Sequence, residues 1–477
     1  MSGAGWTTVI GLEVHVQVAT ATKLFCPCAY RFGAPPNTLV CPVCLGLPGA
    51  LPVLNEGALD LALKAALACG CTVGEVTAFD RKNYFYPDLP KGYQISQLDR
   101  PVGLGGAVPL PAGREIALER IHLEEDAGKS THRPGTGSLV DLNRCGVPLL
   151  EVVSRPELRT PEEARDYLVA LKQIMRYAGI SECDMEKGSL RCDANLSLKP
   201  AAAAALGTRV EVKNLNSFRM VQRALAFEEK RQAAVLDHGG EVVQETRLWD
   251  EQEGVTRTMR TKEESEDYRY FPEPDLPPRR IAAARLERLR RELPEAPLAR
   301  RRRFTAELGL SDYDAMVLTL ERDTADFFEA TARACGDPKG AANWVQGEVL
   351  RHLKEEGVAL AATGLAPESL GRLIGLVQAG KLTGQTAKQV FDRLAREGGD
   401  PEEIVARLGL DRIEDEEELE RLVRRAVAEN PEPVAHYRKG KESALKALMG
   451  PIMRATRGRA DPRKTMALIR RIVEDRR

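Results

Sequence analysis

The sequence predicts an α+β protein with a strand-rich N-terminal part and a helical C-terminal part. Residues 1 to about 293 combine alternating apolar strands with a few helices, and the lack of strict strand–helix alternation favours α+β over a doubly wound sheet. A proline-rich segment at 271–278 can form neither a helix nor a central strand. Beyond it, the chain continues as successive amphipathic helices. We therefore expect domains at 1–293, 294–408 and 409–477.

Local patterns predict the elements of the first domain. Helices are expected at 56–69, 161–178 and 217–237. The second of these begins with Thr160 as the capping residue and Pro161 at the first helical position. Apolar–polar alternation predicts the strands, at 8–18, 115–123, 138–143, 148–153, 189–198 and 208–213.

The composition excludes several classes of protein. A chain of 477 residues has room for roughly two to four domains, and 43% hydrophobic residues supply their cores. The net charge of −1 excludes a protein that is basic over its whole surface, so any nucleic-acid contact must be local. We find no signal peptide and no apolar stretch of membrane-spanning length, and therefore expect a cytoplasmic location and no membrane partner.

The first predicted strand carries chemistry on one face. Its valines point to one side, whereas Glu13, His15 and Gln17 share the other. Further acidic segments follow at 122–132 and 191–195. Carboxylates, an imidazole and lysines gathered on one sheet suit a magnesium–nucleotide site, because the metal needs oxygen ligands and the phosphates need cations. Three unrelated solvated strand faces are the alternative.

Four cysteines are spaced as a closed metal site. Cys26 and Cys28 form a C-x-C pair, and Cys41 and Cys44 form a C-x-x-C pair after a loop of 12 residues. In a reducing compartment, thiolates with this spacing can surround one tetrahedral Zn²⁺. Sulfur would fill every coordination position, so we expect a structural zinc knuckle at 24–46 that performs no chemistry.

Two familiar motifs are excluded. The segment 127–131 resembles the end of a phosphate-binding P-loop, G-x-x-x-x-G-K. The first glycine of that motif would fall at position 123, which is Leu123 in this chain. His122 and Glu124 form the H-x-E of zinc deaminases, but the C-x-x-C pair precedes them in this chain instead of following.

The segment at 80–97 combines tyrosines and a phenylalanine with lysines, amides and prolines. Such a loop can cover a nucleotide, with aromatic rings beside the base or ribose and cations near phosphate. An ordered surface loop without a ligand is the alternative.

A basic patch is confined to the C-terminal end. Residues 434–477 contain 13 Lys/Arg against 4 Asp/Glu, a local excess of +9. Glycines at 440, 450 and 458 would let the backbone approach a folded RNA, with the cations meeting its phosphates. The alternative is a solvated C-terminal helix. The expected tRNA contacts are Lys439, Lys441, Arg454, Arg457 and Arg459.

Seven segments closely resemble the B-subunit family of the bacterial aspartyl/glutamyl-tRNA amidotransferases. These segments are GLEVH (11–15), DRKNYFYPD (80–88), LEEDAGK (123–129), DLNR (141–144), GSLRCDAN (188–195), KNLNS (213–217) and DYRYFPEP (267–274). They are long, and the resemblance covers essentially the whole chain. The archaeal relatives carry an inserted domain for which this chain has no room.

The resemblance implies a fold and a reaction. The first domain would resemble the antiparallel-sheet core of glutamine synthetase, followed by a helical domain and a small YqeY-like helical tail. The reaction would convert misacylated Asp-tRNA(Asn), Glu-tRNA(Gln) or both to the amides, with ATP and Mg²⁺. Because a carboxylate is a poor acyl donor, phosphoryl transfer would first make an acyl phosphate.

The resemblance also implies partners. Ammonia would come through a channel from glutamine hydrolysed by an amidase A subunit, and a small C subunit would complete a heterotrimer. A non-discriminating aminoacyl-tRNA synthetase is a further partner that the resemblance allows, and the partner synthetases decide which misacylated tRNA exists.

Site residues are carried over by matching position. The metal and kinase-site positions are Glu13, His15, Glu124, Glu125 and Asp193. Lys82 and Lys91 match lysines that line the channel end next to the kinase site. The nucleotide or substrate positions are Asn83, Tyr84, Asn143, Arg191 and Asn195.

Two other classes of function fit parts of the sequence. An ATP-dependent amide ligase for a small free substrate is one, and the basic tail counts against it. A zinc-stabilised tRNA-binding scaffold without activity is the other, and Glu13, Glu124 and Glu125 count against that. Phosphate release with ATP and misacylated tRNA distinguishes the three.

Overall fold

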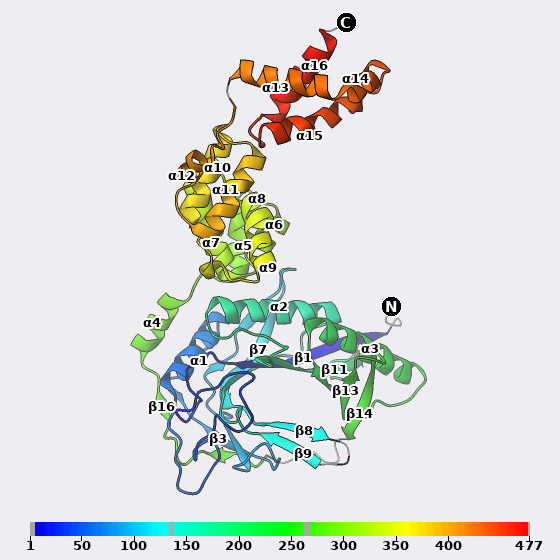
Figure 1. Cartoon of the computed structure of the whole chain (residues 1–477). Coiled ribbons are helices and arrows are strands. Elements are labelled where there is room, and N and C mark those ends of the chain that lie inside the picture. The colour runs from blue at the N-terminus through cyan, green and yellow to red at the C-terminus, as the bar shows by residue number, and fades with distance from the viewer. Residues whose placement is uncertain (1–4, 134, 136, 262–267, 414, 476–477) are drawn as a thin grey trace. The chain divides into compact units, whose positions relative to one another are not determined.

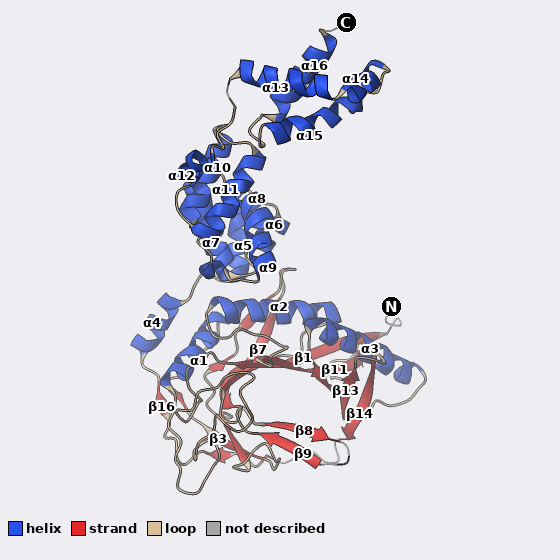
Figure 2. Cartoon of the chain, in the orientation of Figure 1, coloured by secondary structure: helices blue, strands red, loops and turns tan. Residues whose placement is uncertain are grey.

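The computed structural model describes residues 5–133, 135, 137–261, 268–413 and 415–475. Asp267, in the last of the seven quoted segments, lies outside these residues. The chain forms two compact units, residues 1–298 and 299–477 (Figure 1). Within the described part of the chain, the strands belong to the first unit and the second is helical (Figure 2).

The elements of the first unit follow one another without strict alternation. Its helices are α1 (Glu56–Ala68), α2 (Pro161–Tyr177), α3 (Phe218–Asp237) and α4 (Ala283–Glu292). Its strands are β1 (Trp6–Gln17), β2 (Val76–Thr77), β3 (Asp80–Asn83), β4 (Tyr93–Ser96), β5 (Gly103–Leu104), β6 (Ala107–Pro109), β7 (Glu115–Glu125), β8 (Lys129–Arg133), β9 (Gly137–Asp141), β10 (Pro148–Ser154), β11 (Leu190–Pro200), β12 (Val210–Leu215), β13 (Glu245–Asp250), β14 (Val255–Thr261), β15 (Phe271–Pro272) and β16 (Arg279–Arg280).

A nine-stranded sheet forms the centre of this unit. Its order is β14-β13-β12-β11-β1-β10-β7-β5, and β6 also pairs with β7. Neighbouring strands are antiparallel, except that β12 and β13 run parallel. The parallel pair arises because α3 connects these strands as a crossover helix. The predicted α+β class is confirmed, with a sheet that is antiparallel apart from this one pair.

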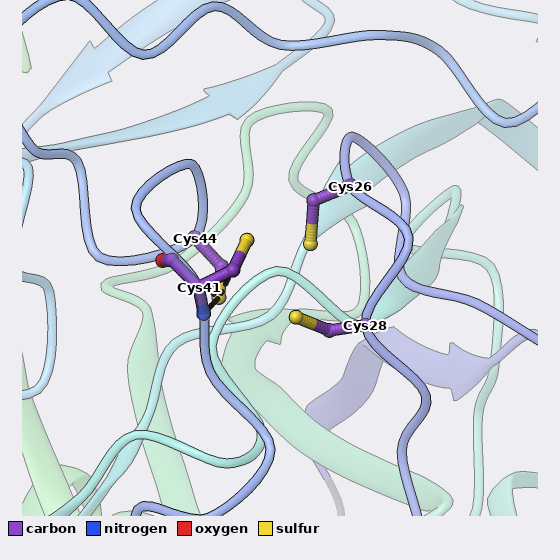
Figure 3. Close-up of side chains that lie close together, drawn as sticks. All are labelled: Cys26, Cys28, Cys41 and Cys44. Atoms are coloured by element: carbon purple, nitrogen blue, oxygen red, sulfur yellow. Dashed lines mark hydrogen bonds between the residues drawn. The ribbon is translucent and has the colours of Figure 1, made fainter.

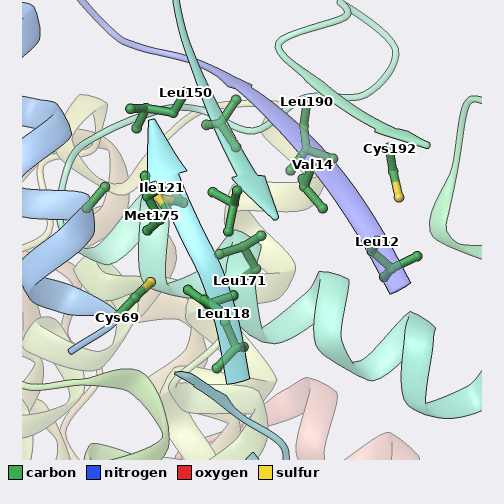
Figure 4. Close-up of a cluster of buried hydrophobic side chains, with 14 of the residues drawn as sticks. Leu12, Val14, Cys69, Leu118, Ile121, Leu150, Leu171, Met175, Leu190 and Cys192 are labelled. Atoms are coloured by element: carbon green, nitrogen blue, oxygen red, sulfur yellow. The ribbon is translucent and has the colours of Figure 1, made fainter. Parts of the chain in front are cut away.

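One face of the sheet is apolar and packs against helices. Leu12 of β1 and Leu150 of β10 are buried there together with Leu171 and Met175 of α2 (Figure 4). Each such leucine contributes about 2 kcal/mol when buried. As predicted, the Thr160 side chain accepts a hydrogen bond from the first turn of α2. This packing leaves the other face of the same strands to polar side chains.

Smaller sheets lie across from the polar face. The strands β15-β3-β4 form one and β8-β9 another (Figure 1). β15, which begins the proline-rich segment, is an edge strand, as proline requires.

The second unit consists of short helices around two apolar clusters. The first cluster includes Phe304, Phe328 and Phe391, and the second includes Val423 and Ile452. The helices are α5 (Pro297–Leu308), α6 (Asp312–Leu318), α7 (Arg322–Cys335), α8 (Pro338–Trp344), α9 (Leu350–Glu356), α10 (Pro367–Gln378), α11 (Gly384–Glu397), α12 (Pro401–Leu408), α13 (Glu416–Glu429), α14 (Pro431–Arg438), α15 (Lys446–Ala455) and α16 (Pro462–Glu474), with a π-helical turn at Val345–Val349 and 3-10 turns at Leu360–Ala362 and Glu442–Leu445.

The boundary between the two clusters coincides with the end of α12. Gly409 ends that helix in the left-handed conformation, with a φ of 61°. The clusters also touch, because the Thr383 hydroxyl donates a hydrogen bond to the Gly458 carbonyl at 2.6 Å.

The sequence located the longer elements within a few residues. The three predicted helices correspond to α1, α2 and α3, and the six predicted strands to β1, β7, β9, β10, β11 and β12. It missed the strands β13 and β14, the short strands β5 and β6, and every strand of the smaller sheets except β9. Across the described residues, no helix is long and apolar enough to cross a membrane.

Candidate active site

A cavity of about 710 Å³ lies against the polar face of the large sheet. Glu13 and His15 of β1 and Arg191 and Asp193 of β11 line it. The strand register places His15 opposite Arg191 and Glu13 opposite Asp193. The structure therefore brings together two pairs of residues from strands that lie far apart in the sequence.

A row of three side chains crosses the sheet at this cavity. Because β10 lies between β1 and β7, Glu151 stands opposite His15 on one side and His122 on the other. Its Oε2 lies 3.4 Å from His15 Nε2 and 3.3 Å from His122 Nε2. Glu124 joins the row, with its oxygens 3.8 Å and 3.4 Å from the same two nitrogens. Glu151 and His122 are site residues that the sequence alone did not predict.

The charges of this row support one another. Burial opposes protonation of His122, but Glu151 and Glu124 outweigh it and raise the pKa of the imidazole to about 9. Burial likewise disfavours the Glu151 carboxylate, yet His122 and His15 hold its pKa well below the usual value. The Glu151 carboxylate is therefore ionised at neutral pH, as a cation-binding site requires.

The neighbouring part of the cavity contains paired charges. Asn195 Nδ2 donates to Glu13 Oε1 at 3.1 Å. Lys213 Nζ lies 2.5 Å from Asp193 Oδ2, and Arg191 Nη2 lies 2.8 Å from Asp126 Oδ2. Burial and the nearby carboxylates raise the pKa of Glu13.

Lys82 and four tyrosines (Tyr84, Tyr86, Tyr268 and Tyr270) line the cavity across from the sheet. Lys82 Nζ lies 4.8 Å from the ring centroid of Tyr268. Tyr84 packs edge-to-face against Tyr268, with 6.0 Å between the ring centroids, and Tyr268 packs in the same way against Tyr270, with 6.2 Å between the centroids. The predicted aromatic segment thus reaches the cavity through Lys82, Tyr84, Tyr86, Gln94 and Gln97.

Glu125 is not brought into this cavity, which corrects the expected grouping with Glu124. Successive residues of β7 point to opposite sides, and Glu125 forms a buried ion pair with Lys91. The Glu125 carboxylate also accepts a hydrogen bond from the Ile95 N–H at 3.0 Å. Lys91 and Glu125 line a separate cavity of about 200 Å³.

Two predicted ligand-contact residues have backbone partners instead. Asn83 Nδ2 donates to the carbonyl of Arg269 at 2.8 Å. Asn143 is buried and joins the segment at 35–39, accepting from the Leu39 N–H and donating to the Pro35 carbonyl. Neither lines the large cavity, because both side chains hold loops in place.

The four cysteines converge from two loops (Figure 3). The sulfurs of Cys26, Cys28, Cys41 and Cys44 all lie within 4.8 Å of one another, which is compatible with one zinc ion.

The charge beside this cluster also fits zinc. Lys23 is fully buried, and its Nζ donates to the Leu39 carbonyl at 2.8 Å and to Cys44 Sγ at 3.5 Å. A buried ammonium needs opposite charge nearby, and four thiolates around Zn²⁺ carry a net negative charge. Hydrogen bonding from Cys26, together with Lys23, lowers the pKa of Cys44 to about 4.

The predicted tRNA contacts of the tail lie in two turns. Lys439 and Lys441 are exposed after α14, and Arg454 and Arg457 are exposed at the end of α15. Arg459 is half-buried and donates to the Thr456 carbonyl at 3.3 Å.

Comparison with known proteins assigns the chain. Residues 8–287 match the GatB/GatE catalytic domain. The chain belongs to the GatB/GatE family. Residues 326–473 also match the GatB domain.

Relatives in this family are similar over nearly their whole length. The B subunit of the aspartyl/glutamyl-tRNA(Asn/Gln) amidotransferase from Carboxydothermus hydrogenoformans is 51% identical, over 98% of both chains. The proteins of the same name from Solidesulfovibrio magneticus and Thermoanaerobacter pseudethanolicus are 52% and 48% identical, over 96% and 98% of this chain and 97% and 98% of the relatives. The predicted family, and membership of an enzyme of the amidotransferase class, are confirmed.

A sequence signal existed for one missed residue. Glu151 is the one charged position in the otherwise apolar strand 148–153, and a lone carboxylate there must face a polar partner. His122 shares a strand face with Glu124 by alternation, whereas its second partner, Glu151, comes from another strand.

Proposed function

We propose that this chain activates a side-chain carboxylate with ATP and converts it to an amide, as the B component of a tRNA-dependent amidotransferase. The substrates would be Asp-tRNA(Asn), Glu-tRNA(Gln) or both, in keeping with the relatives' name. The row of His15, Glu151 and His122 with Glu124 carries the proposal. Buried carboxylates beside a lysine in a roomy cavity are what phosphoryl transfer requires.

His15, Glu124 and Glu151 are the residues that would hold Mg²⁺. One ligand atom from each lies within 4.8 Å of the others, and two carboxylates supply the oxygens that Mg²⁺ prefers. Glu13 and Asp193, on the same sheet face, remain in the proposal as further ligands of the metal–nucleotide complex. Bound Mg²⁺ would offset negative charge on the phosphoryl group.

The other cavity residues would position the nucleotide and the substrate. Burial opposes the charge of Lys82, but Glu124 helps keep the pKa of its ammonium above the usual value, so it can meet a phosphate. Tyr84 would lie beside the base or ribose, and Arg191 near the substrate carboxylate. Asn195 would orient Glu13 through its hydrogen bond.

The second cavity would lie on the route of ammonia. Glu124 and Glu125 are adjacent in β7 and line different cavities, so this strand forms part of the wall between the two. Lys91 and Glu125 would guide ammonia toward the activated carboxylate. The ammonia would come from glutamine hydrolysed by the amidase A subunit, with the small C subunit completing the heterotrimer.

The remaining parts of the proposal concern the metal knuckle and the tail. Cys26, Cys28, Cys41 and Cys44 would hold a structural zinc ion. The exposed cations of the segment 409–477 would bind phosphates of the tRNA. A non-discriminating synthetase in the cytoplasm would deliver this misacylated tRNA.

One assay separates this proposal from its rivals. Phosphate release and amide formation are measured in the assembled complex with ATP and each misacylated tRNA. Release that depends on misacylated tRNA supports the proposal. Release with a free amino acid alone supports a small-substrate ligase, and binding of tRNA without release supports a scaffold.

A further inference from the structure

The cysteine cluster borders the cavity that contains the Lys91–Glu125 ion pair. Cys26 and Cys44 line this cavity of about 200 Å³ together with Lys91, Glu125 and the glycine Gly46. The knuckle at 24–46 is therefore one wall of the cavity, in addition to being a local loop.

Gly46 makes direct contact with Lys91. It lies two residues after Cys44 and has a φ of +67°, in the left-handed region that favours glycine. A Cβ added at Gly46 would overlap with Cγ of Lys91 and lie 3.2 Å from its Cα and Cβ. These atoms are backbone and the middle of a side chain, so they cannot make room without shifting the ammonium.

Gly146 provides a second contact between the same groups. A Cβ there would lie 3.4 Å from Cys44 Cβ, 3.6 Å from Lys23 Cδ and 3.8 Å from Glu125 Oε2. The Gly146 carbonyl also accepts a hydrogen bond from the Leu24 N–H at 2.8 Å. Lys91 is thus packed against the knuckle, and Glu125 lies beside Gly146, a residue that is hydrogen-bonded to the knuckle.

The ion pair depends on such support. The side chains of Lys91 and Glu125 are only 8% and 2% exposed. A buried charge that loses its partner is strongly unfavourable, so small displacements matter here. The knuckle has little apolar core of its own, so its shape depends on the thiolates being held together.

We propose that the metal-bound knuckle sets the position of the Lys91 ammonium against Glu125, with Gly46 as the positioning residue. The knuckle then influences the delivery of ammonia as well as local folding. This step rests on the proposed function, in which Lys91 and Glu125 lie on the ammonia route.

Two glycine variants test the contact without touching a metal ligand. Gly46→Ala places a methyl group against Lys91. Gly49→Ala is the matched control. Gly49 borders the same cavity and has a φ of +85°, but a Cβ added there would have no neighbouring atom within 4 Å. Both variants carry similar backbone strain, and both should retain zinc.

The amide of Ile95 reports on the ion pair, because it donates to Glu125 Oε1. In the full chain, we expect hydrogen exchange at Ile95 to become about 10-fold faster in Gly46→Ala and in the zinc-free Cys41→Ser variant. Gly49→Ala should exchange at the original rate. Unchanged exchange at Ile95 in Gly46→Ala, or equal acceleration in Gly49→Ala, would overturn the proposal.

The assembled complex supplies a functional readout. Gly46→Ala should lower the amide formed per glutamine hydrolysed by roughly 10-fold, and adding it to Lys91→Ala should cause no further loss, because both act through one group. Additive losses would contradict a role through Lys91. If the unaltered complex forms no amide, the proposed function fails, whereas the zinc and exchange measurements still decide the positioning role.

Discussion

Replacing Glu151 by glutamine tests the proposed site directly, because it removes one charge from the row and keeps the side-chain shape. Glu151 lies 3.4 Å from His15 Nε2, and its side chain is 9% exposed. A unit positive charge at that separation interacts with the carboxylate by about 5 kcal/mol at an effective dielectric constant near 20. Loss of one electrostatic stabiliser in an active site typically costs roughly 10²- to 10³-fold in rate. We expect a fall of that size in amide formation by Glu151→Gln.

The assay is amide formation by the assembled complex with ATP and misacylated tRNA, repeated over a range of Mg²⁺ concentrations. Glu119→Gln is the matched control, because Glu119 lies on β7 with its side chain 53% exposed and 3.3 Å from Arg155. Circular dichroism and zinc content should be unchanged in both variants. A Glu151→Gln rate within about threefold of the original, or an equal loss in Glu119→Gln, would refute the assignment of the row.

Four further results are expected. Cys41→Ser should release zinc, measured by metal analysis, and increase proteolysis within residues 20–48; full zinc retention would contradict the cluster. Glu125→Ala should abolish amide formation while tRNA binding stays nearly intact, since the tRNA contacts are expected in the tail; near-normal product would remove Glu125 from the ammonia route. Removing residues 409–477 should weaken tRNA binding and flatten its salt dependence by roughly one unit of slope per lost phosphate contact, and unchanged isotherms would make the patch a solvated surface. Burial raises the pKa of Glu348, but hydrogen bonds from a neighbouring lysine and arginine outweigh it and hold the pKa below 4.5. The Glu348 carboxylate therefore stabilises the fold above pH 4.5, and this stabilisation is lost as the pH falls through the lowered pKa of the folded state. Glu348→Gln should cost roughly 1 kcal/mol in urea unfolding at neutral pH, and progressively less as the pH falls below 4.5.

Local periodicity determined which side chains share a face. Alternation along the first strand predicted that Glu13 and His15 point away from the core, and the structure places both in the large cavity. The cysteine spacing similarly predicted convergence of four sulfurs, because the two short pairs need only one loop to meet. Both inferences depend on neighbours in the chain.

The same rule separates Glu124 from Glu125. Adjacent residues of a strand face opposite sides, so the two carboxylates line different cavities. The roles assigned to them by family position stay predictions, and alternation alone already places the two carboxylates on opposite sides of the strand.

Only the tertiary structure decided which strands are neighbours. Glu151 meets His15 and His122 because β10 lies between β1 and β7, although β10 follows β7 by more than 20 residues and β1 by more than 100. Backbone hydrogen bonds are the same for any pair of strands, so they carry no information about partners. The order of the strands in the sheet is the one that buries their apolar faces under α1, α2 and α3. The loops and helices between the strands limit which orders are possible, so the strand order is a property of the whole domain. The sequence therefore determined the chemical character of each strand face, and the packing of the domain determined which of those faces form one site.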